Sequence, residues 1–161
     1  GGVGSATVQL ARARGARIIA ITSPAKADAL RSLGAERTLP RNADLVDELG
    51  TGSVDVVVDL VAGPTWPSLL DVLRSGGRYA VAGAIRGAMV ELDVRTLYLK
   101  DLSFFGCTVL EPQVFANLIG RIERSEITPS VAEEFDLQDI NDAQACFEAK
   151  DHTGKIVLKV S

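Results

Sequence analysis

The first eleven residues constrain this chain most, because Gly1, Gly2 and Gly4 run directly into a segment with helical apolar spacing. The first N–H groups of a helix have no acceptor within it, and the helix dipole makes that end positive. Glycines at this place let a phosphate group approach the backbone. The segment predicts an anion site at a helix N-terminus, although a glycine-rich helix start also occurs as a purely structural feature.

The spacing of Gly1 and Gly4 fits the second and third glycines of the dinucleotide fingerprint G-x-G-x-x-G. The first glycine and the strand that should precede it are absent from the chain. Met89 is the only methionine, so no initiator residue is present. We therefore expect the chain to be a fragment of a longer gene product.

The composition excludes several classes of protein. The chain has 161 residues, of which 47% are hydrophobic and 24% charged, which is enough for one globular core. A net charge of −4, with aromatic residues at only 5%, disfavours a nucleic-acid binder. Neither a membrane-spanning run nor a basic secretory leader is visible, so we expect a cytoplasmic protein without membrane association.

The residues that could ligate a metal are few. Cys107 and Cys146 stand far apart, and His152 is the only histidine. A structural zinc site takes four such ligands, so we expect no metal site within this chain. The simplest interpretation is two buried thiols and a surface imidazole.

Segments of helical spacing alternate with short runs of branched apolar residues, which is typical of βαβ units with a parallel sheet and right-handed crossovers. The run at 54–61 and the run at 17–22 are nearly continuous in apolar character, so both predict strands buried on two faces. The other expected strands are 37–39, 78–83 and 102–109, and the expected helices are 3–14, 25–33, 43–49, 66–73 and 95–99. The fold class is therefore α/β.

The end of the second strand of such a fold selects the coenzyme. An enzyme that prefers NAD places Asp or Glu there, about 20 residues after the glycines, to bind the ribose hydroxyls. This chain has Thr22, Ser23 and Lys26 instead, and no carboxylate before Asp28. Hydroxyl donors and a cation suit a 2′-phosphate, which predicts NADP(H). Lys26 as a solvated surface charge and Ser23 as a mere helix cap remain the alternatives.

Two further polar residues have both a functional and a structural interpretation. Arg41 follows the strand 37–39 and is either a second cation for the same phosphate or a surface loop residue. Asp59 lies near the carboxyl end of the strand 54–61, the edge where open α/β sheets bind ligands. Without a partner histidine, we interpret Asp59 as a carboxylate that anchors a loop rather than as a general base.

Four segments together resemble the medium-chain dehydrogenase/reductase superfamily, especially its zinc-type alcohol dehydrogenase-like and quinone oxidoreductase-like branches. They are residues 1–6, 55–59, 76–78 and 154–158, in that order along the chain. The resemblance implies a Rossmann-type doubly wound parallel sheet over 1–128, truncated at its N-terminus. It also implies that 129–161 is a C-terminal segment that returns to an absent GroES-like catalytic domain, with Phe135, Leu137, Ile140, Ala143 and Phe147 as apolar anchors.

The resemblance also assigns roles by position. It implies hydride transfer between a nicotinamide coenzyme and a carbonyl, alcohol or activated C=C, and leaves open whether the full-length parent binds zinc. Family dimers pair edge strands, so a homodimer through Ser103 to Val109 is expected. The implied coenzyme-binding residues are Gly1, Gly2, Val3 and Gly4 at the diphosphate, Thr22, Ser23 and Lys26 at the adenosine ribose and its phosphate, and Val61 and Gly83 at the nicotinamide half.

Three functions remain open. The first is the coenzyme-binding part of an NADP(H)-dependent oxidoreductase acting on a small molecule. The second is an enoyl-reductase module of a larger synthase, and the third is a non-catalytic nucleotide-binding protein. No residue of this chain is assigned as catalytic.

The strand order of the implied fold makes one more prediction. In the order 3-2-1-4-5-6 the absent first strand lies between the second and the fourth, so its place must be filled. The options are residues that precede Gly1, a strand swapped from a neighbouring molecule, or the segment 155–160.

Overall fold

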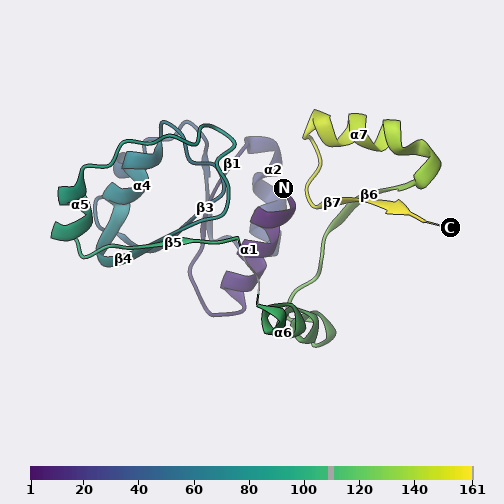
Figure 1. The fold of residues 1–161 in the computed structure, drawn as a ribbon, viewed down its shortest axis with the longest axis horizontal. Coiled ribbons are helices and arrows are strands. Elements are labelled where there is room, and N and C mark those ends of the chain that lie inside the picture. Colours follow the sequence, from purple (N-terminus) through teal and green to yellow (C-terminus); the bar gives the residue numbers. More distant parts are fainter. Residues whose placement is uncertain (109–110, 161) are drawn as a thin grey trace. The chain divides into compact units, whose positions relative to one another are not determined.

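The computed structural model describes residues 1–108 and 111–160, which form an α/β chain of parallel strands and helices (Figure 1). The helices of the described residues are α1 (Gly2–Arg12), α2 (Pro24–Leu33), α3 (Leu45–Leu49), α4 (Trp66–Val72), α5 (Val94–Leu99), α6 (Pro112–Glu123), the 3-10 turn η1 (Leu137–Asp139) and α7 (Ile140–Ala149). The strands are β1 (Ile19–Thr22), β2 (Arg37–Pro40), β3 (Val54–Asp59), β4 (Leu73–Val81), β5 (Ser103–Gly106), β6 (Val131–Asp136) and β7 (Lys155–Lys159).

Local chemistry explains where the helices begin and end. Ser23 precedes α2, Pro24 occupies its first turn, and Gly34 ends it with φ 119°, a left-handed conformation that favours glycine. Asp44 begins α3 because its side chain accepts the N–H groups of Val46 and Asp47. These helices, like α1 and α4, lie within a few residues of their predicted bounds.

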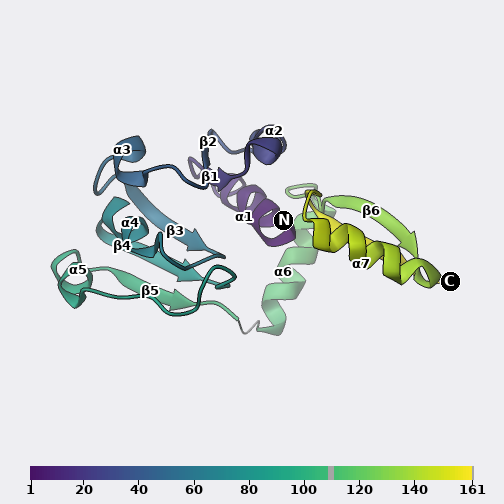
Figure 2. The same cartoon turned by 90° about the horizontal axis from the view of Figure 1, so that it is seen from above.

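Every strand pair in the described residues is parallel, which confirms the predicted α/β class. The ladders give the orders β1-β2, β3-β4-β5 and β6-β7, and Figure 2 shows β3, β4 and β5 side by side. None of these ladders pairs β1 with β3, a pairing that would contradict the predicted strand order. The suggestion that the segment 155–160 takes the place of the first strand is wrong, because β7 pairs with β6 from Val131 to Asp136.

The chain divides into two compact units, one formed by Gly1–Arg41 with Glu111–Ser161 and the other by Asn42–Leu110. The core of the first unit contains Val8, Ala20, Leu30 and Ala35. The core of the second unit contains Trp66, Leu70, Leu73, Tyr79 and Leu102. The boundary at 128/129 between a coenzyme domain and a returning segment stays a prediction.

The expectation that the strands at 17–22 and 54–61 are buried on both faces is wrong within these units. In β1, Ala20 and Thr22 are buried, whereas Ile19 and Ile21 are 40% and 44% exposed. In β3, the side chains of Val56 and Val58 are likewise exposed. Each strand packs on its own unit's core with alternate residues only, because that unit supplies apolar cover to one face.

Two strands differ in length from their predictions. β4 begins at Leu73 rather than at the predicted residue 78. Its register against β3 shifts, so that Val54 pairs with Leu73 and Val56 pairs with Arg78. The extra residues of this irregularity include Ser75, Gly76 and Gly77, which precede the predicted strand 78–83. β5 is shorter than the predicted strand 102–109, and Val109 lies outside the described residues.

Within the first unit, the C-terminal segment forms a βαβ arrangement in which β6 and β7 are connected through η1 and α7 (Figure 1). Of its five predicted apolar anchors, only Ala143 is buried here. Phe135 is half-buried, and Leu137, Ile140 and Phe147 are exposed. Docking of this segment on a further domain stays a prediction.

The predicted burial of the two cysteines holds only in part. Cys107 is exposed, which contradicts the expectation, because the strand that precedes it forms an exposed sheet edge. The Sγ of the half-buried Cys146 donates to Glu133 Oε2 at 3.1 Å. His152 is partly buried rather than on the surface, and it stacks near Phe147 with a ring-centroid distance of 5.8 Å.

In the described part of the chain, no helix has both the length and the apolar character to span a membrane.

Candidate coenzyme site

The N-terminus of α1 presents a row of free backbone donors. Gly1 occupies the N-cap position, and the first intrahelical hydrogen bond runs from the Ser5 N–H to the Gly1 carbonyl at 3.0 Å. The N–H groups of Gly2, Val3 and Gly4 therefore have no acceptor within the helix. The Ser5 hydroxyl donates to the Gly2 carbonyl at 3.0 Å, so this buried side chain fixes the first turn. Open donors on a fixed turn can receive an anion.

The glycines at this helix start differ in what surrounds them. An added Cβ at Gly1 would meet no atom within 4 Å, so the protein itself leaves that position open. An added Cβ at Gly2 would overlap the side chain of Lys155 and lie 2.9 Å from its Nζ. Lys155 is the first residue of β7, and the sequence analysis did not include it among the site residues.

Three cations gather near this helix end. Burial and then the charges of Lys26, Arg41 and Lys155 lower the pKa of the Gly1 amino group. The Nζ of Lys26 also donates to the Lys150 carbonyl, so Lys26 is not simply a solvated charge. The local potential is therefore positive where the helix dipole is positive as well. The role of Lys26 at the 2′-phosphate stays a prediction.

The two predicted hydroxyl donors lie between β1 and α2. Thr22 ends β1 and is 7% exposed, whereas Ser23 is half-buried at the N-cap of α2. The Ser23 side chain makes no capping hydrogen bond to that helix, so the alternative that it serves as a side-chain cap is not realised. Its hydroxyl remains available to a ligand.

Val61 and Gly83 belong to the second compact unit, and the backbone of each is in contact with other residues of that unit. The Val61 N–H donates to Asp59 Oδ1 at 2.8 Å, and its carbonyl accepts the N–H of Arg86 at 3.0 Å. An added Cβ at Gly83 would lie 2.7 Å from the Leu60 carbonyl oxygen. The lack of a side chain at Gly83 therefore makes room for the backbone of Leu60, the residue that follows β3. The nicotinamide role of both residues stays a prediction.

Asp59 anchors the loop that follows β3, as its sequence position suggested. The carboxylate is 5% exposed; Oδ1 accepts the N–H groups of Val61 and Ala62 at 2.8 and 3.0 Å, and Oδ2 accepts the Tyr79 hydroxyl at 2.7 Å. Burial first, and the hydrogen bond to Asp59 second, raise the pKa of Tyr79. All the contacts of Asp59 are structural, and none leaves it free to act as a base. The sequence analysis did not identify Tyr79, because the sequence does not show which side chain a tyrosine in a strand will contact.

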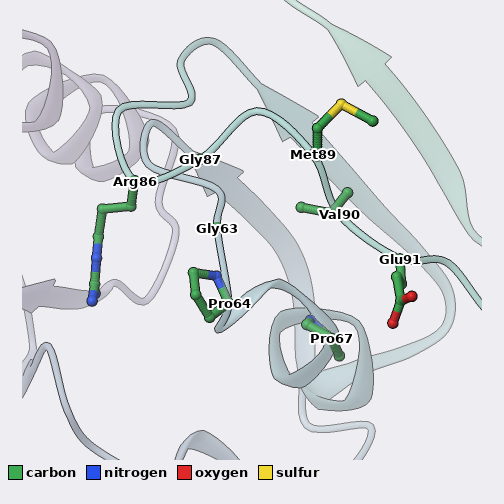
Figure 3. A pocket seen from close by; sticks show the side chains of 8 residues that line it. All are labelled: Gly63, Pro64, Pro67, Arg86, Gly87, Met89, Val90 and Glu91. Atoms are coloured by element: carbon green, nitrogen blue, oxygen red, sulfur yellow. The ribbon is translucent and has the colours of Figure 1, made fainter.

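The second unit also holds a pocket of about 320 Å³ beside the start of α4 (Figure 3). Figure 3 shows Pro64 and Pro67 in the middle of the view, Arg86 on one side and Met89, Val90 and Glu91 along the segment on the other. Gly63 and Gly87 complete the lining. Its lining combines the apolar side chains of Pro64, Pro67, Met89 and Val90 with one cation, Arg86, and one carboxylate, Glu91. The sequence analysis gave no role to the loop 84–93 because it has no recognisable motif.

The described residues contain no cluster of three or more His, Cys, Asp or Glu side chains that would hold a metal ion. Whether other parts of the protein hold zinc stays open. The groups that do fit a cofactor are the donors and cations at the start of α1, which suit phosphate oxygens.

Comparison with known proteins agrees with this geometry. The family model described as zinc-binding dehydrogenase matches residues 2–124. The crystal structure of a putative alcohol dehydrogenase from Sinorhizobium meliloti 1021 is 43% identical, with a TM-score of 0.90 over 99% of this chain and 46% of that chain. A mycobacterial protein solved in complex with NADPH is 28% identical, with a TM-score of 0.83 over 99% of this chain and 54% of that one.

A third similar protein is far longer. A spectinabilin polyketide synthase system protein from Streptomyces orinoci is 33% identical over 170 residues, which cover 98% of this chain and 8% of that protein. This chain thus spans about half the length of the similar solved structures and a small part of the synthase protein. The resemblance to the medium-chain dehydrogenase/reductase superfamily is confirmed.

Proposed function

We propose, because this chain belongs to the zinc-binding dehydrogenase family, that it forms the coenzyme-binding part of an NADP(H)-dependent oxidoreductase. The observation that carries the proposal is the start of α1, where the free N–H groups of Gly2, Val3 and Gly4 lie near three cations. The phosphate groups of NADP(H), the diphosphate and the 2′-phosphate together, satisfy these donors and neutralise these charges. The similar mycobacterial structure, which was solved with NADPH, supports this choice of coenzyme.

Within this proposal the chain's residues bind and orient the coenzyme. The amides at the start of α1 hold the diphosphate, and Ser23 and Lys26 hold the 2′-phosphate, with Thr22 beside them at the end of β1. Val61 and Gly83 flank the nicotinamide half. The nicotinamide supplies or accepts the hydride, and the substrate is a carbonyl, an alcohol or an activated C=C. No residue of this chain is assigned a proton-transfer role.

The partners and location complete the proposal. β5 is the edge strand of its sheet, and Phe104 and Phe105 on it are 37% and 48% exposed. An apolar edge of this kind is a liability unless it is covered, which supports a homodimer through 103–109. Free thiols at Cys107 and Cys146 agree with a reducing compartment such as the cytoplasm.

The test measures the affinity of the intact protein for NADPH and for NADH, using the fluorescence of the bound nicotinamide as the signal. Tighter binding of NADPH is expected, together with its oxidation by at least one member of a panel of quinones, enones and aldehydes. Failure to bind either nucleotide would refute the proposal. Binding without hydride transfer to any acceptor would favour the non-catalytic nucleotide-binding protein.

One observation favours a second candidate, an enoyl-reductase module. The similarity to a polyketide synthase system protein covers 98% of this chain. In that case the acceptor is a 2-enoyl thioester rather than a free quinone or aldehyde. Comparing NADPH oxidation by a crotonyl thioester with oxidation by a quinone separates the two candidates, because each predicts the opposite order of kcat/KM.

A further inference from the structure

The pocket beside the start of α4 adjoins the loop that carries Val61, one of the two residues proposed to flank the nicotinamide. The Val61 carbonyl accepts the N–H of Arg86 at 3.0 Å. Gly63 has φ 81°, and an added Cβ there would lie 2.7 Å from the Arg86 carbonyl oxygen. The loops after β3 and β4 are therefore joined through the backbone of Arg86. All these residues belong to one compact unit, so the position of the pocket relative to Val61 is defined.

The middle of this pocket is apolar. Pro64 and Pro67 line it from the start of α4, and Met89 and Val90 line it from the segment that follows β4 (Figure 3). Its volume of about 320 Å³ lies in the range of small-molecule sites. We call these four side chains the apolar wall. They can remove a hydrocarbon group of a ligand from water.

The protein's own core does not use the outer part of the apolar wall. Met89 is 91% exposed and Val90 is 38% exposed, whereas Leu92 farther along the segment packs against the core of the second unit. The segment is thus held at one end by the backbone of Arg86 and at the other by Leu92. Exposed apolar side chains on a segment held in this way indicate a contact with a ligand or with another protein.

The two charged residues of the pocket do not change this preference. Figure 3 shows Arg86 on one side of the prolines and Glu91 on the other. Both residues are exposed, so their charges stay in water, where an ion pair adds little binding energy. The pocket therefore favours an apolar group over a charged one.

We infer that this pocket binds the apolar tail of the substrate, an inference that rests on the proposed function. The reacting carbon lies at the nicotinamide, beside Val61 and Gly83, and the rest of the substrate continues past Gly63 onto the apolar wall. The substrate class is an unsaturated or carbonyl compound with a hydrocarbon chain. Each CH₂ group of the chain that leaves water strengthens binding about fourfold.

The test uses the intact protein with NADPH and two series of acceptors, trans-2-enals and 2-enoyl thioesters of N-acetylcysteamine, with four, six, eight and ten carbons in the chain. The value of kcat/KM should rise by up to about fourfold per CH₂ group until the pocket is full. The double variant Met89→Ser, Val90→Ser should lose most of this rise, whereas Met89→Leu should keep it.

Two matched controls separate the apolar wall from its surroundings. Val94→Ser changes a residue that is 61% exposed and begins α5 without lining the pocket. Arg86→Gln removes the cation of the pocket and keeps its apolar wall. Both variants should show the chain-length dependence of the wild type.

A binding measurement makes the test independent of turnover. Met89 is the only methionine of this chain, and its ¹³C-methyl signal in the intact protein is assigned by its loss in Met89→Leu. Titration of the NADPH complex with saturated primary alcohols of four to ten carbons should shift this signal. The Kd should decrease about fourfold per CH₂ group.

The outcomes separate the inference from the proposed function. NADPH binding with an unmoved Met89 signal, or with the same chain-length dependence in the double variant, would overturn the inference alone. A dependence lost in Arg86→Gln would make the pocket an anion site and overturn it as well. A double variant that changes only the oligomeric state would assign the segment to a contact between copies of the chain, against the inference. Absence of nucleotide binding by the wild type would refute both.

Discussion

The start of α1 and the loop after β3 are two polar regions of the molecule, and they differ in how their groups are satisfied. Asp59 in the loop has three hydrogen bonds from its own unit and is buried. The start of α1 has amides without acceptors, and Lys155 there is a cation without an ion-pair partner in the described chain. Satisfied polar groups hold a fold together, whereas unsatisfied ones that converge indicate a ligand.

The largest expected effect is on stability, from Asp59→Ala. This change leaves the N–H groups of Val61 and Ala62 and the hydroxyl of Tyr79 without their acceptor inside the protein. The free energy of unfolding should fall by about 4 kcal/mol, measured by urea denaturation. Asp55→Ala is the control, because that exposed carboxylate pairs only at the surface with Arg74 and should leave the midpoint unchanged. A stable Asp59→Ala protein that binds coenzyme but has lost turnover would instead make Asp59 a functional residue.

A smaller effect is expected for Tyr79→Phe, which removes one hydroxyl and keeps the ring among Trp66 and Phe104. The free energy of unfolding should fall by about 2 kcal/mol at pH 7, because Asp59 Oδ2 loses its donor. Nucleotide affinity should not change. Tyr98→Phe is the control, since Tyr98 is 61% exposed.

The same hydroxyl predicts a pH dependence. Burial raises the pKa of Tyr79 in the folded protein, so the fold retains a proton that the unfolded chain loses above pH about 10. Stability from this group is complete below that pH and decreases as pH rises further. Urea titrations from pH 8 to 11 should show a steeper loss for the wild type than for Tyr79→Phe. Parallel curves would contradict the assigned cause of the shift.

The smallest expected effect is on binding, from Lys26→Ala. NADPH affinity should weaken about tenfold, or about 1.4 kcal/mol, while NADH affinity stays the same, because only NADPH has a 2′-phosphate. Fluorescence titration of the two nucleotides measures the difference. Lys150→Gln is a useful control, because Lys26 contacts the carbonyl of that residue and not its side chain. Equal losses for both nucleotides would refute the role of Lys26.

Much of the fold was predictable because its determinants are local. Ser23, Pro24 and Gly34 marked the ends of α2 with caps that act over a few residues. Runs of branched apolar residues marked β1 and β3. Their one-sided burial was not predictable, because a continuous apolar run does not reveal which layer of helices covers it.

The sequence by itself determined the parallel α/β class, the glycine-rich helix start and the family, since each depends on spacing along the chain. Only the tertiary structure decided that Tyr79 holds Asp59, that Gly83 faces Leu60 and that Lys155 lies against Gly2. These pairs come from segments far apart in sequence, and which of them meet depends on how the strands and helices pack. A residue's type limits the partners it accepts, and packing selects one of them.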